Sequence, residues 1–304
     1  MQSSTHLPLA ATDVDSASNS WTVGDVMALM ESWYPAETAQ SWDRVGLIVG
    51  DPGAPAKSIL LALDPTAMVA AQAVAGPDGG GDCFDMVITH HPLLLRGASF
   101  LPVSDPKGAV VTTLIRSGIA LFNAHTNADV ACDGVATALA DLIGLREATP
   151  LEPSGIDADG HDIGLGRVGN VDETTLGALA DHVAAVLPAG PTGLLVGGDE
   201  AMRVRRVAVL GGAGDSALEA AREAGADVYL TADLRHHPAS EHLEGGSPAL
   251  LCGSHWATES PWLPVLARRL RAAAANAGVE VCVEVSTIVT EPWTSHRVTQ
   301  GELA

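Results

Sequence analysis

The stretch MVITHHPLLLRG, residues 86–97, places two adjacent histidines directly after a short apolar run. The run from Met86 to Thr89 is apolar and mostly β-branched, which predicts a buried strand. Pro92 favours an extended, turning exit from that strand. Because ligands of open α/β sheets gather at the carboxyl ends of strands, His90 and His91 are expected at a binding site.

Strand-like and helical segments alternate along the rest of the chain. Apolar β-type runs are expected at 58–64, 119–129, 204–212, 226–233, 248–255 and 279–287, with helical segments between most of them. This alternation predicts an α/β fold built around mainly parallel sheets.

The composition changes near residues 146–170, where Pro, Gly and Asp become frequent. Such residues are typical of connecting segments, so we place a domain boundary there. The predicted organisation is a disordered tail over 1–20, a first α/β domain over 21–149 and a second α/β domain over 150–304.

The second half of the chain repeats the pattern of the first. DMVITHHP (85–92) resembles ADVYLTADLRHHP (226–238), and LFNAHTNAD (121–129) resembles LLCGSHWATE (250–259). In the second pair, an apolar strand is followed by a histidine, three residues and a carboxylate. The repetition predicts two related units that face each other across a pseudo-two-fold axis.

The paired histidines and carboxylates have the spacing of metal chelators. His125 precedes Asp129 by four residues, and His255 precedes Glu259 by four. If a helix follows each strand, residues at this spacing share one helix face. Imidazole and carboxylate ligands together suit a borderline divalent metal such as Zn, Mn, Fe, Co or Ni.

The number of candidate ligands favours two ions. Four histidines and two carboxylates exceed the three or four protein ligands of one catalytic ion and match two. Each of these residues, taken singly, also has an explanation without metal. A histidine could be a hydrogen-bonded core residue, Asp129 could be a helix cap, and Glu259 could be a solvated helix residue. His236 and His237 repeat the HHP motif, and we expect them to line the same cleft without binding metal.

Charge and composition argue against several classes of function. The formal net charge is -21, which repels phosphate backbones and argues against general nucleic-acid binding. No apolar run approaches the roughly 18 residues that span a bilayer, so no membrane partner is expected. The four cysteines are scattered without a CxxC pair, which fits reduced thiols in the cytoplasm.

These motifs resemble a known family, the dinuclear metal-binding proteins described as GTP cyclohydrolase 1 type 2 or NGG-interacting-factor-three-like. The resemblance rests chiefly on WDRVGLIVGDP (42–52), ITHHPLLLRG (88–97), AHTNADVACDGV (124–135), GADVYLTADLRHHPA (225–239) and GSHWATES (253–260).

The resemblance implies two α/β domains with two divalent ions (Zn, Fe, Mn or similar) in the cleft between them. It also implies a ring-shaped homohexamer. The metal ligands carried over by motif are His90, His91, Asp129, His255 and Glu259, with Glu259 as the bridge. His125 is implied as a further ligand or as a catalytic group that supports the ligands.

Two stretches depart from the family pattern. Asp43-Arg44 stands where members usually have Asp-Asn, and Thr231-Ala232-Asp233 stands where they have Thr-Gly-Asp. We expect neither stretch to contact the metal ligands.

By resemblance, the expected activity is that of GTP cyclohydrolase I, in which GTP and water give dihydroneopterin triphosphate and formate. Arg96 and Lys107 are candidates for holding the phosphates of such a small-molecule substrate. Two alternatives stay open. One is a metal-binding or metal-handling scaffold or regulator without catalysis, and the other is a two-metal hydrolase of a different phosphate or amide.

Overall fold

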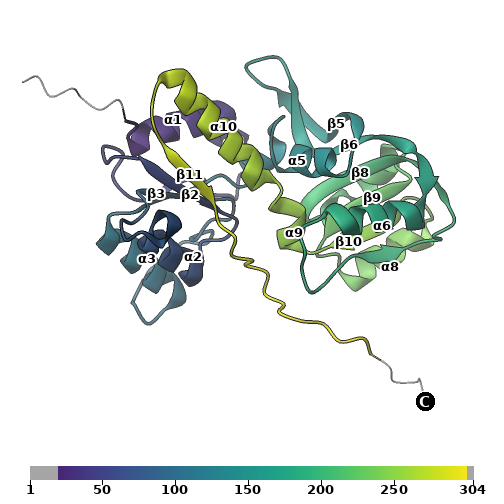
Figure 1. Cartoon of the computed structure of the whole chain (residues 1–304). Helices are drawn as coiled ribbons and strands as arrows, with labels where there is room; N and C mark the ends of the chain where they lie inside the picture. Colours follow the sequence, from purple (N-terminus) through teal and green to yellow (C-terminus); the bar gives the residue numbers. More distant parts are fainter. Residues whose placement is uncertain (1–19, 300–304) are drawn as a thin grey trace, which may run out of the picture.

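A computed structural model describes residues 20–299 of the chain. All but the last residue of the expected tail over 1–20 therefore lie outside the described residues. The described part forms two β-sheets with helices packed around each, so the predicted α/β class is confirmed (Figure 1). None of its helices combines the length and apolar character that crossing a bilayer requires.

The first sheet contains the strand of the opening stretch at its centre. Its order is β1 (Gly46–Val49), β4 (Ala120–Asn123), β3 (Met86–Thr89), β2 (Ser58–Ala62) and β11 (Cys282–Val285). Strands β4, β3, β2 and β11 run parallel, whereas β1 pairs antiparallel with β4 at one edge. All four residues of β3 are buried, which agrees with their continuous apolar run.

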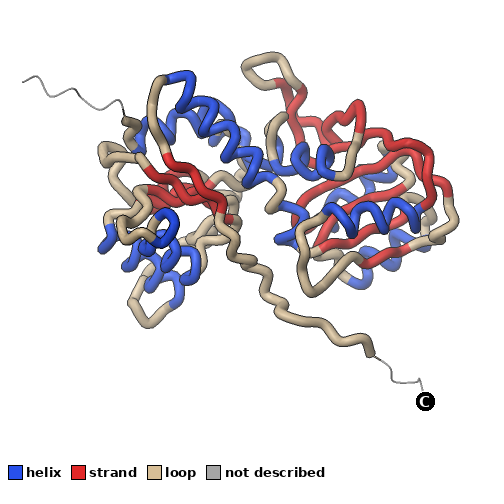
Figure 2. The backbone as a smooth tube through the Cα atoms, in the orientation of Figure 1, coloured by secondary structure: helices blue, strands red, loops and turns tan. Residues whose placement is uncertain are grey.

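The second sheet is mixed. Its order is β5 (Arg146–Ile156), β6 (Asp162–Thr175), β8 (Arg203–Ala213), β9 (Val228–Ala232), β10 (Ala249–Gly253) and β7 (Leu195–Gly197). Strands β8, β9 and β10 are parallel, and the other pairings are antiparallel. The long β5–β6 hairpin projects from the second sheet, and its turn lines a pocket with residues of α1 (Val23–Trp33) and α10 (Trp262–Ala277) (Figure 2).

The two halves have the same order of elements. The helices of the first half are α1 (Val23–Trp33), α2 (Ala67–Ala75), α3 (Pro106–Ser117), α4 (Thr126–Val130) and α5 (Val135–Leu142). Their counterparts in the second half are α6 (Leu176–Val186), α7 (Leu218–Glu223), α8 (His236–Glu244), α9 (His255–Glu259) and α10 (Trp262–Ala277). The 3-10 helices are η1 (Ala36–Thr38), η2 (Pro77–Gly79) and η3 (Asp215–Ala217).

The sheets repeat this correspondence. The strand order β2-β3-β4-β1 matches β8-β9-β10-β7, with an antiparallel edge strand last in both. The duplication expected from the repeated motifs is therefore visible in the topology. Strands β5, β6 and β11 stand outside the repeat.

Each half places its last helix on the sheet of the other half. Leu139 and Ile143, in and just after α5, lie in the hydrophobic core of the second sheet with Val207. Conversely, Leu266 of α10 packs with Leu61 of the first sheet. The last helices of the two halves are thus exchanged.

Strand β11, near the C-terminal end of the described residues, lies in a different sheet from the strands that directly precede it in the chain. Strand β11 pairs in parallel with β2, with Cys282 opposite Ser58, so it belongs to the first sheet. The expected second domain over 150–304 includes this strand, since an apolar strand carries no mark of the sheet it will join. Where the domains divide stays a prediction.

Helix caps follow the expected chemistry. The Thr22 side chain accepts a hydrogen bond from the Asp25 amide, and the Asp25 side chain accepts one from the Thr22 amide. This capping box fixes the start of α1.

Candidate metal centre

Two adjacent histidines leave the end of β3 with different partners. His90 is fully buried and its Nδ1 donates to the carbonyl of Ala124 at 2.9 Å. The Nδ1 of His91 donates to Asp64 Oδ1 at 2.7 Å. Because each Nδ1 carries the proton, each Nε2 is left to face the space between the two halves.

The other two histidines are held in the same way. His125 lies at the start of α4, and its Nδ1 donates to the buried Asp43 at 3.0 Å. His255 opens α9, and its Nδ1 donates to Asp233 at 2.7 Å. Carboxylate or carbonyl partners on Nδ1 are the usual support of histidines that bind metal through Nε2.

Glu259 brings the two halves of the centre together. Its carboxylate is buried and lies 3.0 Å from His91 Nε2, 3.1 Å from His255 Nε2 and 3.7 Å from His90 Nε2. The Nε2 atoms of His91 and His255 are 3.2 Å apart. Asp129 lies 3.6 Å from His90 Nε2, on the side of the first half.

Gly212 makes room for this approach. Its φ is +72°, and a Cβ added there would lie only 2.2 Å from Glu259 Oε1. Its amide donates to Thr258 in the helix that carries Glu259. The glycine-rich end of β8 therefore serves the site by letting α9 come close.

Two buried polar atoms at the centre point to a cation. Within residues 20–299, neither His90 Nε2 nor Glu259 Oε2 has a hydrogen-bond partner. The 3.0 Å contact between Glu259 Oε2 and His91 is an ion-pair distance without hydrogen-bond alignment. Orphaned buried atoms of this kind are rare in native proteins, and a metal ion would satisfy both.

The donor atoms form two overlapping groups suited to a metal. His90, His91 and His125 offer ligand atoms within 4.8 Å of one another, and so do His91, His255 and Glu259. Nitrogen and carboxylate donors fit a borderline divalent ion. The clusters could therefore bind metal, and the number and identity of the ions stay a prediction.

The electrostatics of the centre reflect strong coupling between imidazole and carboxylate. Burial alone would lower the pKa of His91, but the hydrogen bond to Asp64 and the negative charges of Glu259 and Asp64 raise it to about 10. Burial would also lower the pKa of His255, but Glu259 and Asp233 raise it to about 9. Burial would raise the pKa of Glu259, yet the neighbouring histidines, His90 first, hold it well below its usual range. Burial raises the pKa of Asp129 to about 6.

All six residues expected from the sequence are thus brought to one place. The expectation that the two departing stretches avoid the ligands was wrong, since Asp43 holds His125 and Asp233 holds His255. Asp64 was missed, although a carboxylate at the end of the strand beside the two histidines was a usable signal. Asp233 has φ 53°, a left-handed conformation that is costly for a residue other than glycine.

The second HHP motif forms the first turn of α8. His236 and His237 stand exposed at the start of α8, with their ring centroids 5.1 Å apart. Whether they line the cleft of the metal centre stays a prediction.

The fold and the centre together define a class of protein: two related α/β units with a histidine- and carboxylate-rich candidate metal centre between them. The chain belongs to the Duf34/NIF3 (NGG1p interacting factor 3) family, whose model matches residues 21–292. The resemblance stated from the motifs is therefore confirmed.

Curated relatives share most of their length with this chain. It is 44% identical to a GTP cyclohydrolase 1 type 2 homolog of Streptomyces coelicolor, over 90% of this chain and 94% of the relative. A protein of the same description from Mycobacterium leprae is 33% identical, over 89% of this chain and 94% of the relative.

Solved structures show the same fold. A hypothetical protein of Staphylococcus aureus superposes with a TM-score of 0.81 at 28% identity, over 91% of this chain and 100% of that one. Reduced HcgD from Methanocaldococcus jannaschii superposes with a TM-score of 0.69 at 26% identity, over 88% of this chain and 98% of that one.

Proposed function

We propose that this protein is a hydrolase that depends on two divalent metal ions. One observation carries the proposal: four histidines are anchored through Nδ1, and the Nε2 atoms of His90, His91 and His255 lie within 3.7 Å of the buried carboxylate of Glu259. That arrangement is assembled from both halves of the chain and leaves buried polar atoms unpaired.

The residues proposed to hold the ions are His90, His91, Asp129, His255 and Glu259. Two such ions, when bound, would supply Lewis-acid chemistry by lowering the pKa of a water molecule and polarising the bond under attack. Glu259 has contacts on both sides of the centre, which supports its proposed role as the bridge.

His125 is proposed to act in proton transfer or as a sixth ligand. Its Nδ1–H is fixed on Asp43, which also accepts hydrogen bonds from the amide and hydroxyl of Thr126. Asp43 would therefore stabilise a positive charge on the ring, so Nε2 could take up a proton from a substrate or water and return it.

GTP is the substrate suggested by the description of the relatives. A triphosphate would need cations to balance its charge. Arg44 donates to the backbone carbonyls of Ser41 and Asp43, while Arg96 and Lys107 are exposed. The metal ions themselves would then carry most of the charge that attracts an anionic substrate.

The activity test uses purified full-length protein loaded with Zn, Mn or Fe. After incubation with GTP and oxidation, a fluorescent pterin is expected from the wild type and is expected to be absent from His91→Ala. Equal signals from both, or none from either, would overturn GTP cyclohydrolase activity. A panel of other phosphates and amides would then show whether a different substrate is hydrolysed.

The metal test is independent of the substrate. We expect two ions per chain in the wild type and the loss of both in Glu259→Ala. Glu241→Ala, which removes an exposed carboxylate from α8, is the matched control and should keep the full content. Unchanged content in Glu259→Ala would contradict the proposed centre.

A second candidate function is metal handling without catalysis. Carboxylates surround the histidines, and their negative charge favours cations over anionic substrates. These carboxylates belong to Asp43, Asp64, Asp129, Asp233 and Glu259. The His255 side chain is 34% exposed, which gives an ion access to the centre. A delivery protein should pass its ions to an acceptor protein or chelator readily, whereas a hydrolase should retain them through turnover.

Assembly into a ring-shaped homohexamer is proposed on the resemblance alone. Several large apolar side chains are exposed in the single chain, among them Phe100, Trp293 and Val298. Light scattering should give a mass about six times the 31.1 kDa of one chain. A mass of one chain would contradict the proposal.

A further inference from the structure

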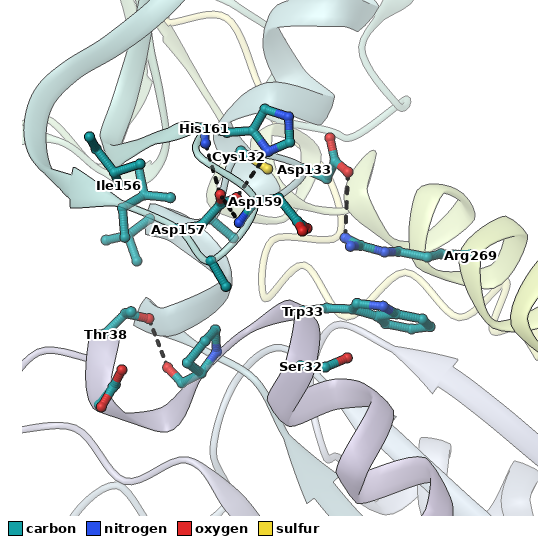
Figure 3. A pocket seen from close by; sticks show the side chains of 16 residues that line it. Ser32, Trp33, Thr38, Cys132, Asp133, Ile156, Asp157, Asp159, His161 and Arg269 are labelled. Carbon is teal, nitrogen blue, oxygen red and sulfur yellow. Dashed lines mark hydrogen bonds and ion pairs between the residues drawn. The ribbon is translucent and has the colours of Figure 1, made fainter.

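A second group of metal-ligating side chains lies outside the histidine centre. Cys132 follows α4, while Asp157 and His161 belong to the turn between β5 and β6 (Figure 3). One ligand atom from each lies within 4.8 Å of the other two. The three come from different parts of the fold, so the group is formed by tertiary structure.

The backbone around these side chains is fixed. The carbonyl of Cys132 accepts hydrogen bonds from Thr137 Oγ1 at 2.5 Å and from Arg167 Nη2 at 3.3 Å. The Asp157 carboxylate accepts the amides of Asp159 and His161 at 3.0 and 2.8 Å. The first two contacts fix the backbone at Cys132, and the other two fix the turn. The three ligand atoms therefore start close together, and only small movements would complete a site.

We propose that Cys132, Asp157 and His161 bind one borderline divalent cation, such as Zn²⁺, at a site separate from the histidine centre. Thiolate, imidazole and carboxylate are all ligands of that class of ion. In a tetrahedral site with ligand distances of about 2.0–2.3 Å, neighbouring ligand atoms lie about 3.3–3.7 Å apart. His161 Nδ1 and Asp157 Oδ2 are already 3.2 Å apart, so only the wider edges must close.

The site forms one wall of a cavity of about 200 Å³ between the β5–β6 turn and helices α1 and α10. Across the cavity, the guanidinium of Arg269 lies 4.6 Å from the centre of the Trp33 ring and 3.6 Å from Asp133 (Figure 3). The His161 side chain is 63% exposed, so an ion can enter from solvent. Three protein ligands leave a fourth position for water or for a small ligand.

Such an ion would fasten the second sheet to the first half. The turn belongs to the hairpin of the second sheet, and Cys132 stands three residues after Asp129 of the histidine centre. The proposed role is therefore a clamp that holds the spacing of the two halves.

Cobalt substitution tests the site directly. Metal-free full-length protein is titrated with Co²⁺ while the near-ultraviolet thiolate-to-cobalt charge-transfer band is recorded. The residues of the histidine centre include no cysteine, so this band cannot come from that centre. We expect the band in the wild type and in His91→Ala, which alters the histidine centre alone.

Three further variants decide the outcome. Cys132→Ser should abolish the band, and His161→Ala, an exposed change, should raise the Kd for Co²⁺ at this band about tenfold or more. Cys282→Ser, which removes an exposed thiol of β11, should leave the band unchanged. No band in the wild type, or a band that survives Cys132→Ser, would overturn the proposal.

Discussion

Replacing Asp64 by Asn measures how far the carboxylates behind the histidines contribute to metal binding. Asp64 accepts the Nδ1–H of His91 at 2.7 Å, and Asp233 accepts that of His255 at the same distance of 2.7 Å. Asparagine is nearly isosteric and keeps an oxygen for Nδ1–H, so each change removes mainly a charge. The two sites differ in solvent access, because the side chain of Asp64 is 29% exposed and that of Asp233 is 56% exposed.

This difference sets the expected magnitudes. Loss of a partner behind a metal-binding histidine costs about 10- to 100-fold in affinity. The charge of Asp64 is less screened by water, so Asp64→Asn should weaken Zn²⁺ binding about 100-fold, or about 2.7 kcal/mol. Asp233→Asn should cost about tenfold. Asparagine tolerates the left-handed backbone at position 233, so the change adds little strain there.

The assay is competition for Zn²⁺ between metal-free protein and a chromophoric chelator at neutral pH. Asp181→Asn, an exposed change on α6, is the control and should match the wild type. Equal losses at the two positions, or a larger loss at 233, would refute the link between burial of the carboxylate and its effect on the metal.

Three other expectations concern protons and packing. In the metal-free protein the pKa of His91 is raised to about 10, so Zn²⁺ binding at pH 7 should release at least one proton and should strengthen as the pH rises. Calorimetry in two buffers of different ionisation enthalpy should detect the released proton. If no proton is released, His91 is not a ligand of the ion. Burial lowers the pKa of His242, whose Nδ1 faces Arg222, so the unfolded chain takes up the proton first and stability is lost as the pH falls below about 6.5. Urea unfolding at pH 7.5 and 5.5 should show a smaller loss in His242→Gln, and equal losses would be the contrary result. Arg167 donates from buried positions to four backbone carbonyls, so Arg167→Met should lower the free energy of unfolding by about 3 kcal/mol or more. The control Arg146→Met removes an exposed ion pair with Asp172 and should leave the free energy of unfolding close to that of the wild type.

The candidate centre was predictable because its residues stand where strands end. In parallel strands the carboxyl ends meet at one edge, so His90, His91 and His125 had to lie close together once β3 and β4 were recognised. The repeat extended this reasoning to His255 and Glu259 in the second half.

The supporting carboxylates were harder to predict. Asp64 follows β2, and its contact with His91 depends on β2 lying beside β3, which strand order alone decides. Asp43 lies in a loop before β1, and no periodic pattern indicates where a loop side chain points. Sequence patterns indicate which segments form strands but not which sheet each strand joins, and the same limit applies to β11.

The exchange of α5 and α10 has a consequence for how the molecule can be divided. Two separate copies of a single unit could trade their last helices in this manner, so the chain has the architecture of a domain-swapped dimer whose subunits are joined end to end. A cut in the linker between the halves would leave fragments that each lack the helix covering their own sheet. Neither fragment could bury its core alone, and association of the two would restore the cores and the metal centre together.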